Sequence, residues 1–472
     1  MVGTWGVLFP RMVPVVTLDR GIFVSVAERL LAGDVLYRDV WDNKDPLFYY
    51  TIALGRAVSP LMDIVLEMAW VALTGVGVAL IARFLGARLR MCVVAGFVMT
   101  PLVLTGPLYF PGNSHLPAVA VATLSVALAL QERYLPAGVL VAVTFFLKLV
   151  VTPALILPLV VIVAVRRQWR GLAWGALGAL LGGGVMVAVL VVRQELVPYL
   201  GMLSANVGYS SSVLLNSSLP APLAHFARLR TPAYGILAAA LILTVVLGAV
   251  RWRRARAGVT GVFSLVTLSV IAAVVAATAV LAVTGLWVQH LLIYGFAAAL
   301  AAALLAALVD ERLGSRPLAS LAVLVVAAVL LAGGPLAAIY PTLPPDKAIR
   351  MLTSTPREAQ VILQTGEPAS YARLGSNDDR GHAVGLGAWH LACPRFHQYR
   401  FDSQSSLDTV TRCLPKADVV YVSTSFAPKT SSLGGSSVWN PWVARTEQVL
   451  RADFTCAALD DGARICVRKE RS

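Results

Sequence analysis

The stretch LDRGIFVSVAERLLAGDVLYRDVWDNKDPLFYY, from Leu18 to Tyr50, is the most polar run in the first 340 residues of the chain. It holds six carboxylates and four basic residues interleaved with aromatic side chains, and apolar segments of membrane-spanning character follow it. Charge is costly beside a bilayer, and aromatic residues gather where the membrane meets water. We therefore expect an external loop at the membrane surface whose polar side chains serve a function.

The composition indicates a polytopic α-helical membrane protein. Of the 472 residues, 58% are hydrophobic and 14% are charged, and the mean hydropathy is +0.75. A soluble protein carries roughly 25% charged residues. Apolar runs of about 20 residues cross a bilayer as helices. Such runs predict about 11 transmembrane helices, near residues 2–18, 63–85, 91–108, 116–131, 134–149, 151–165, 171–193, 232–250, 259–283, 288–309 and 317–339.

Topology explains the net charge of +14. Many basic residues lie in short loops between the apolar runs: Arg83, Arg88, Arg90, Arg133, Arg166, Arg167, Arg170, Arg251, Arg253, Arg254, Arg256, Arg312 and Arg316. Basic loops face the cytoplasm, so this pattern orients the chain and indicates no nucleic-acid partner. The other side then receives Leu18–Tyr50, Tyr109–His115, Gln194–Thr231 and the turn before His290.

A soluble α/β domain is expected after the membrane region. Pro341, Pro344 and Pro345 form a hinge, which separates a transmembrane domain over 1–340 from an extracytoplasmic domain over 341–472. The expected strands are Tyr371–Gly375, Ala417–Ser423 and Arg464–Arg468, and the expected helices are Pro356–Leu363 and Asn440–Leu450.

Cysteine usage supports this orientation. Four of the five cysteines lie in the C-terminal domain, and an even number in an extracytoplasmic domain suggests disulfides. The simplest pairs are Cys393–Cys413 and Cys456–Cys466, although the sequence allows three pairings. A zinc site is the rival interpretation, but the spacing lacks CxxC pairs.

The polar stretch divides into two helices. Apolar residues recur with helical period over Gly21–Leu31, Gly33 and Asp34 break the pattern, and Pro46 starts a second helix that runs to Arg56. We expect such helices to lie on the membrane surface and hold a lipid-linked headgroup. The Ser- and Asn-rich Gln194–Thr231 is expected to be an external loop, either a lid, an acceptor-facing segment or a plain connector.

Asp19 and Lys44 are the leading candidates for chemistry. Asp19 precedes a helix and can take a proton from an acceptor hydroxyl, although it also suits capping of a helix that begins near Gly21. Lys44 can neutralise a phosphate that leaves with its lipid. The alternative is a local ion pair with Asp42 or Asp45, which is worth little.

Three further residues are candidates in the membrane region. Lys148 lies in an apolar run without an acidic neighbour, which favours phosphate binding over snorkelling to the surface. His290, at the mouth of a span, is either a phosphate-binding residue or an interface anchor. His115 is similar. No metal cage, nucleophilic triad or P-loop spacing is present.

These residues resemble a known family. Leu18-Asp-Arg-Gly21, Ala27–Gly33 and Tyr37–Pro46 resemble the first external loop of the GT-C superfamily of glycosyltransferases, in the branch of protein O-mannosyltransferases and aminoarabinose transferases. Phe146-Leu-Lys148 and Gln289-His290-Leu-Leu recur in that branch at matching places. The likeness covers roughly residues 18–310, and the cysteine-bearing C-terminal domain suits actinobacterial-type members.

The resemblance implies inverting transfer of a sugar, mannose or arabinose among them, from a polyprenyl-phosphate donor to an extracytoplasmic glycan, lipid or protein at the bacterial cytoplasmic membrane. It implies Asp19 as the catalytic carboxylate and Lys44 as the donor-phosphate lysine. From their own positions in the chain, Lys148 and His290 are expected to bind the phosphate as well. Arg20, Asp42, Asn113 and His115 are supporting candidates.

Three departures from the family pattern limit what carries over. Arg20 replaces the usual acidic residue, Lys44-Asp45-Pro46 replaces Lys-Pro-Pro, and Asn113-Ser114-His115 stands where a second acidic residue is common. No cofactor is assigned, and a role for a divalent metal stays open. The alternative functions are a transporter or lipid flippase, and a membrane-anchored binding protein that works through its C-terminal domain.

Overall fold

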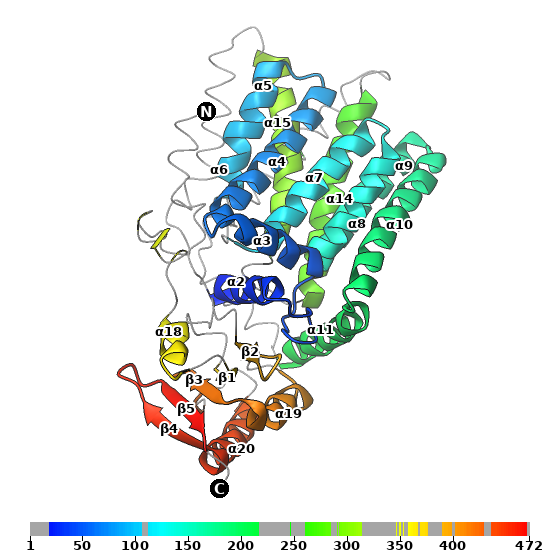
Figure 1. Cartoon of the computed structure of the whole chain (residues 1–472). Helices are drawn as coiled ribbons and strands as arrows, with labels where there is room; N and C mark the ends of the chain where they lie inside the picture. Colours follow the sequence, from blue (N-terminus) through cyan, green and yellow to red (C-terminus); the bar gives the residue numbers. More distant parts are fainter. Residues whose placement is uncertain are drawn as a thin grey trace. The chain divides into compact units, whose positions relative to one another are not determined.

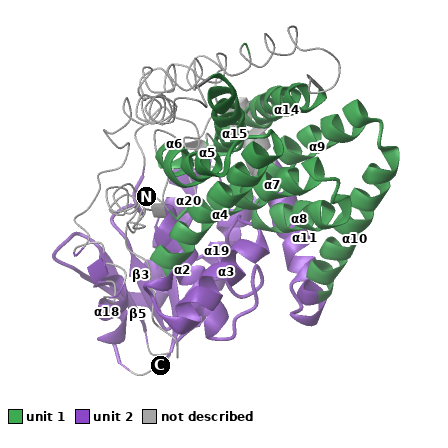
Figure 2. Ribbon diagram, turned by 90° about the horizontal axis from the view of Figure 1, so that it is seen from above, with its two compact units in different colours: residues 1–14, 63–188, 220–345 green, residues 15–62, 189–219, 346–472 purple. Residues whose placement is uncertain are grey.

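The computed structural model describes residues 18–105, 112–216, 246, 260–284, 290, 292–313, 346, 349–350, 353, 357–366, 369–375, 389–398, 402–428 and 436–469. These residues divide into two compact units, coloured separately in Figure 2. Unit 1 takes its described residues from 63–188 and 220–345, and unit 2 from 15–62, 189–219 and 346–472.

Unit 1 is built from apolar helices (Figure 1). In chain order they are α4 (Met62–Phe84), α5 (Leu89–Val94), the π-turn Ala95–Met99, α6 (Thr100–Leu104), α7 (His115–Leu130), α8 (Tyr134–Leu147), the 3-10 turn Leu149–Val151, α9 (Thr152–Arg166), α10 (Trp169–Val192), α14 (Thr260–Thr284) and α15 (Ile293–Leu313).

Five of the described helical stretches are long and apolar enough to cross a membrane, which makes the chain a helical membrane protein. They are Met62–Phe84, Leu149–Arg166, Trp169–Val192, Gly261–Leu281 and Ile293–Arg312. The runs expected at 91–108, 116–131 and 134–149 form shorter apolar helices. The spans expected at 2–18, 232–250 and 317–339, and the proline hinge, lie outside the described residues.

Small residues allow α8 and α10 to approach closely. A Cβ on Gly138 of α8 would lie 1.9 Å from the carbonyl oxygen of Gly175, and one on Gly178 of α10 would lie 2.0 Å from that of Leu135. Backbone-to-backbone contact of this kind is how apolar helices pack where lipid removes the hydrophobic driving force.

The two helices expected in the polar stretch are present in unit 2. The second, α3 (Pro46–Val58), begins at the predicted proline, with Asp45 as the N-cap residue. The first, α2 (Leu18–Leu31), corrects the prediction, because it includes Asp19 in its first turn instead of starting near Gly21. It is also buried on nearly every side and is not a surface helix with one apolar face. Its buried Ser25 hydroxyl is satisfied within the helix, because Oγ donates to the Gly21 carbonyl oxygen (2.9 Å).

A third helix replaces much of the loop expected over Gln194–Thr231. Residues Leu196–Asn216 form α11, and the rest of that loop lies outside the described residues. Its serines and asparagines misled the prediction, because such residues are common in loops. Here polar side chains of α11 bond the loop before α3 instead.

The C-terminal part of unit 2 contains a five-stranded mixed sheet in the order β2-β1-β3-β5-β4. The strands are β1 (Ser370–Leu374), β2 (His390–Leu391), β3 (Val419–Val422), β4 (Phe454–Ala458) and β5 (Arg464–Arg468). β1 pairs in parallel with β2 and β3, whereas β5 pairs antiparallel with β3 and β4. The predicted strands β1, β3 and β5 are confirmed, and β2 and β4 were not predicted.

Helices cover both faces of this sheet. Residues of α19 (Gln404–Cys413) and α20 (Ser436–Asp453) share one apolar core with alternate residues of β1 and β3. Residues of α18 (Arg357–Leu363) pack with the other alternate residues. The opposite faces follow from the two-residue period of a strand. The helices predicted at Pro356–Leu363 and Asn440–Leu450 correspond to α18 and α20.

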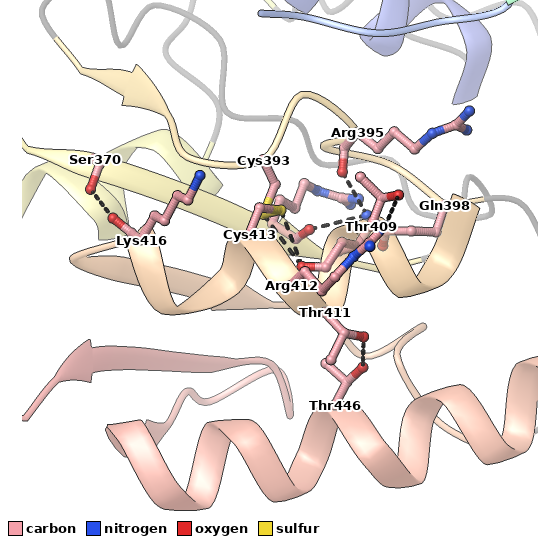
Figure 3. Close-up of a disulfide and its surroundings, with 12 residues drawn as sticks. Ser370, Cys393, Arg395, Gln398, Thr409, Thr411, Arg412, Cys413, Lys416 and Thr446 are labelled. Carbon is pink, nitrogen blue, oxygen red and sulfur yellow. Dashed lines mark hydrogen bonds between the residues drawn. A yellow bond between two sulfur atoms is a disulfide. The ribbon is translucent and has the colours of Figure 1, made fainter. Parts of the chain in front are cut away.

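Two disulfides join these elements, and they are the pairs that the sequence favoured. Cys393, which follows β2, bonds Cys413 at the end of α19 (Figure 3). Cys456 bonds Cys466, which lies directly opposite it in the β4–β5 ladder. The remaining cysteine, Cys92, is buried in unit 1 as a free thiol.

Candidate functional site

The segment between α2 and α3 is a tightly bonded loop. Tyr37 adopts the left-handed conformation (φ 65°), and its N–H donates to the Val40 carbonyl (2.7 Å). Its hydroxyl donates to the carbonyl of Lys44 (2.7 Å). Arg29, at the end of α2, forms an ion pair with Asp34 (2.7 Å). These bonds fix the backbone that carries Lys44.

Lys44 is a buried cation with an unusual set of neighbours. Its side chain is 8% exposed, and its ammonium donates to the side-chain oxygen of Asn43. It also lies over the Phe23 ring of α2, 5.5 Å from the centroid. Among the residues that the structure describes, no carboxylate forms a salt bridge with Lys44. The local ion pair considered from the sequence is therefore not formed.

Asp42, one candidate partner of Lys44, bonds other groups. Its Oδ1 lies 3.1 Å from Nε2 of His397, and its Oδ2 accepts a hydrogen bond from the Tyr49 hydroxyl. Both Asp42 and His397 are fully buried. Burial raises the pKa of Asp42, but the positive charge of Lys44 and the bonds from His397 and Tyr49 outweigh burial and hold it well below its usual range. Asp42 is thus a buried carboxylate that stays ionised.

Helix α11 bonds the segment between α2 and α3, which we call the Lys44 loop. The hydroxyl of Tyr199 donates to Asp45 (3.1 Å), and the amide of Asn206 donates to the carbonyl of Asn43 (3.1 Å). The residues on both sides of Lys44 are therefore fixed by α11, whereas the ammonium contacts the Asn43 oxygen and the Phe23 ring and forms no salt bridge with a described carboxylate.

Glu195, which immediately precedes α11, is a buried carboxylate that the sequence analysis missed. It accepts hydrogen bonds from the Leu36 N–H (3.3 Å) and the Tyr50 hydroxyl, and its Oε1 lies 2.9 Å from Nε of Arg193. Burial raises its pKa to about 7, although the Leu36 N–H and Arg38 act in the opposite direction. The Arg193 guanidinium is 40% exposed, so water weakens its opposing effect.

The first turn of α2 contains Asp19 and Arg20. Asp19 is half-buried and Arg20 is buried. Asp19 precedes Phe23 by four residues, which puts both on one face of the helix. Since Lys44 lies over Phe23, the leading carboxylate and the leading cation share the same side of α2.

The other candidates lie in unit 1, where Asn113, His115 and His290 contact one another. Nδ1 of His115 contacts the side-chain oxygen of Asn113, and the rings of His115 and His290 lie 5.2 Å apart. Buried Glu67 of α4 accepts a hydrogen bond from the Gly112 N–H (3.1 Å) and was not predicted. Lys148 occupies an extended break between α8 and the turn before α9, where it is buried. Its phosphate role, like that of His290, stays a prediction.

Sequence reasoning also missed His397, because a single histidine beside Phe396 in an irregular segment carries no pattern. Glu195 had a weak signal, as an acidic residue that directly follows an apolar run. In the described part of the chain, no three His, Cys, Asp or Glu side chains gather as metal ligands.

Comparison with known proteins identifies no relative: no protein family, curated protein or solved structure matches this chain. The case for a function therefore depends on the chemistry of the residues described above, above all the arrangement of Asp19, Phe23 and Lys44.

Proposed function

We propose that this chain is an integral membrane glycosyltransferase, which moves a sugar from a polyprenyl-phosphate donor to an extracytoplasmic acceptor. The observation that carries the proposal is the buried Lys44 ammonium, which forms no salt bridge with a carboxylate among the described residues, although the charge of Asp42 lies near enough to act on it. A buried cation is costly without an opposite charge. A lipid-linked phosphate bound at Lys44 supplies that charge.

The proposed reaction uses Asp19 and Lys44 in different roles. Asp19 takes the proton of an acceptor hydroxyl while the hydroxyl oxygen attacks the anomeric carbon of the sugar. The bond from that carbon to the phosphate oxygen breaks, and its electron pair leaves with the polyprenyl phosphate. Lys44 stabilises the negative charge that grows on this leaving group.

The proposed topology has about 11 transmembrane helices and places the C-terminal α/β domain on the extracytoplasmic side of the bacterial cytoplasmic membrane. The two disulfides support that side, because disulfides persist in oxidising compartments. The five apolar helices support the membrane location.

The test uses the purified full-length chain in detergent with a panel of polyprenyl-phosphate sugars, mannose and arabinose first, and cell-envelope extract as acceptor. Release of free polyprenyl phosphate is measured for wild type, Asp19→Asn and Lys44→Ala. Asp39→Asn and Arg38→Ala are matched controls, because these residues pair with each other on the exposed side of the same loop. We expect release to need Asp19 and Lys44 but neither control residue.

Full transfer by Asp19→Asn would show that another group is the base. No release with any donor would refute the proposal. The second candidate is a transporter, which the helix break at buried Lys148 favours, since transporters bind substrates at interrupted helices. Substrate uptake by proteoliposomes without product would establish it.

A further inference from the structure

A short C-terminal segment, residues 389–398, is anchored at three points within its own sheet. Its first residues form β2, which pairs with β1. Cys393 is joined to α19 by its disulfide with Cys413 (Figure 3). Gln398 exchanges hydrogen bonds with the main chain of Gly375 (2.9 and 3.1 Å). Segment 389–398 is therefore a rigid platform.

This platform contacts the polar stretch at its main chain. The Arg29 guanidinium donates to the carbonyl of Trp389, and the N–H of Trp41 donates to the carbonyl of Pro394 (2.8 Å). The bond from Trp41 to Pro394 joins two main-chain groups and depends little on side-chain identity, so it helps to set the register of the two segments.

The same platform contacts the stretch through side chains. The Arg395 guanidinium stacks on the Trp41 ring, and the His397 ring lies on the same indole with centroids 6.4 Å apart. Beyond the indole, His397 reaches Asp42 (3.1 Å). A C-terminal histidine is thus packed against an aromatic residue and aimed at a buried carboxylate two residues from Lys44.

The contact between His397 and Asp42 affects how strongly Asp42 attracts Lys44. Lys44, His397 and the Tyr49 hydroxyl all act on the Asp42 charge, and of these Lys44 is the one on a flexible side chain. Removing one partner of a buried charge leaves that charge desolvated and uncompensated, so an interaction with another group of opposite charge becomes more favourable. Without His397, the flexible ammonium of Lys44 gains by turning toward Asp42, and it then no longer faces a phosphate.

We propose that His397 is a positioning residue of the donor-phosphate site, which satisfies Asp42 and so keeps Lys44 available for the lipid phosphate. This inference rests on the proposed function. If His397 has this role, segment 389–398 is part of the donor site. If the segment instead binds the acceptor, changes in it leave donor binding unaffected.

The experiment measures binding of polyprenyl phosphate to the full-length chain in detergent. Glutamine can present its amide nitrogen near the position of histidine Nε2, and asparagine is too short. We expect His397→Gln to bind like wild type and His397→Asn to bind about tenfold more weakly, as for the loss of one hydrogen bond to a charged group. His390→Asn is the matched control, because His390 is an exposed histidine of β2 in the same segment.

A double variant separates positioning from general damage. If Lys44 is captured by Asp42, then Asp42→Asn in the His397→Asn background removes the capturing charge and recovers affinity. A merely structural role of His397 predicts no such recovery. Should His397→Asn fail to purify as a single species, the double variant decides alone.

Normal binding by His397→Asn, or no recovery in the double variant, would overturn the inference. Lys44→Ala distinguishes this failure from that of the proposed function. Weak binding by Lys44→Ala with normal binding by His397→Asn leaves the proposed function standing, whereas normal binding by Lys44→Ala removes both.

Discussion

The Nζ of Lys44 lies 5.5 Å from the centroid of the Phe23 ring, on the face of α2 that carries Asp19 one turn earlier. A cation over an aromatic face is stabilised by about 0.5–2 kcal/mol, which is less than desolvation of the ammonium costs. The arrangement therefore holds the ammonium in place without a salt bridge to a described carboxylate, which leaves it able to bind an anion.

Replacing Lys44 by methionine should separate stability from binding. Because Lys44 forms no salt bridge with a described carboxylate but its charge helps to keep buried Asp42 ionised, we expect Lys44→Met to lower the apparent Tm less than loss of a salt-bridged buried cation does, while affinity for polyprenyl phosphate falls at least about tenfold. Arg29→Met is the matched control, since Arg29 is also buried on this stretch but pairs with Asp34. It should lower the apparent Tm by several degrees. A comparable Tm loss in Lys44→Met would mean that Lys44 is structural.

Local sequence signals predicted much of the fold. Pro46 gave the start of α3, and β-branched or aromatic runs gave β1, β3 and β5. The signals failed where tertiary contacts decide the structure. β2 has only two residues and exists through its pairing with β1. The sequence of α11 suggested a loop because it is rich in polar residues, but in the fold its polar side chains bond the Lys44 loop.

The residues of the candidate site also fall into two classes, those that a local sequence motif predicts and those that only tertiary contacts reveal. Asp19 and Lys44 were found because each sits in a local motif, Leu18-Asp-Arg-Gly21 and Asp42–Pro46. His397 could not be found, because its role depends on a contact with Asp42 that only the fold creates. Charge in a buried place attracts partners from distant parts of the chain, and spacing in sequence does not record them.

Glu195 should make stability depend on pH between about 4.5 and 7. Burial raises its pKa in the folded chain from 4.5 to about 7, so the folded state binds more protons than the unfolded state in this window. The contribution of Glu195 to the free energy of unfolding is then largest below pH 4.5 and falls by about 3 kcal/mol as pH rises through 7. Glu195→Gln should remove this fall, measured as apparent Tm at pH 5 to 8.

The control for this pH dependence is Glu447→Gln on α20, because Glu447 pairs with Arg464 at a partly exposed position. Its Tm profile should match that of wild type. A wild-type slope in Glu195→Gln would show that another group titrates in this range.

Glycine packing between α8 and α10 should be sensitive to a single methyl group. Gly178→Ala places a Cβ 2.0 Å from a backbone oxygen, so the helices must separate, at a cost of about 1–3 kcal/mol. Gly183, five residues along the same helix, has no atom within 4 Å of its Cβ position. Gly183→Ala should therefore be neutral or slightly stabilising. Equal Tm values for the two variants would refute close packing of these helices.

Removal of each disulfide in turn should distinguish global stability from support of the Lys44 loop. The bonds Cys393–Cys413 and Cys456–Cys466 span 20 and 10 residues, so chain entropy gives each about 3 kcal/mol. We therefore expect similar Tm losses when both cysteines of either pair become alanine. Only loss of Cys393–Cys413 should weaken polyprenyl phosphate binding, because Cys393 precedes Pro394, whose carbonyl holds Trp41. Hydrogen exchange at Trp41 should rise in that variant alone, and equal binding by both variants would show that the platform does not support the loop.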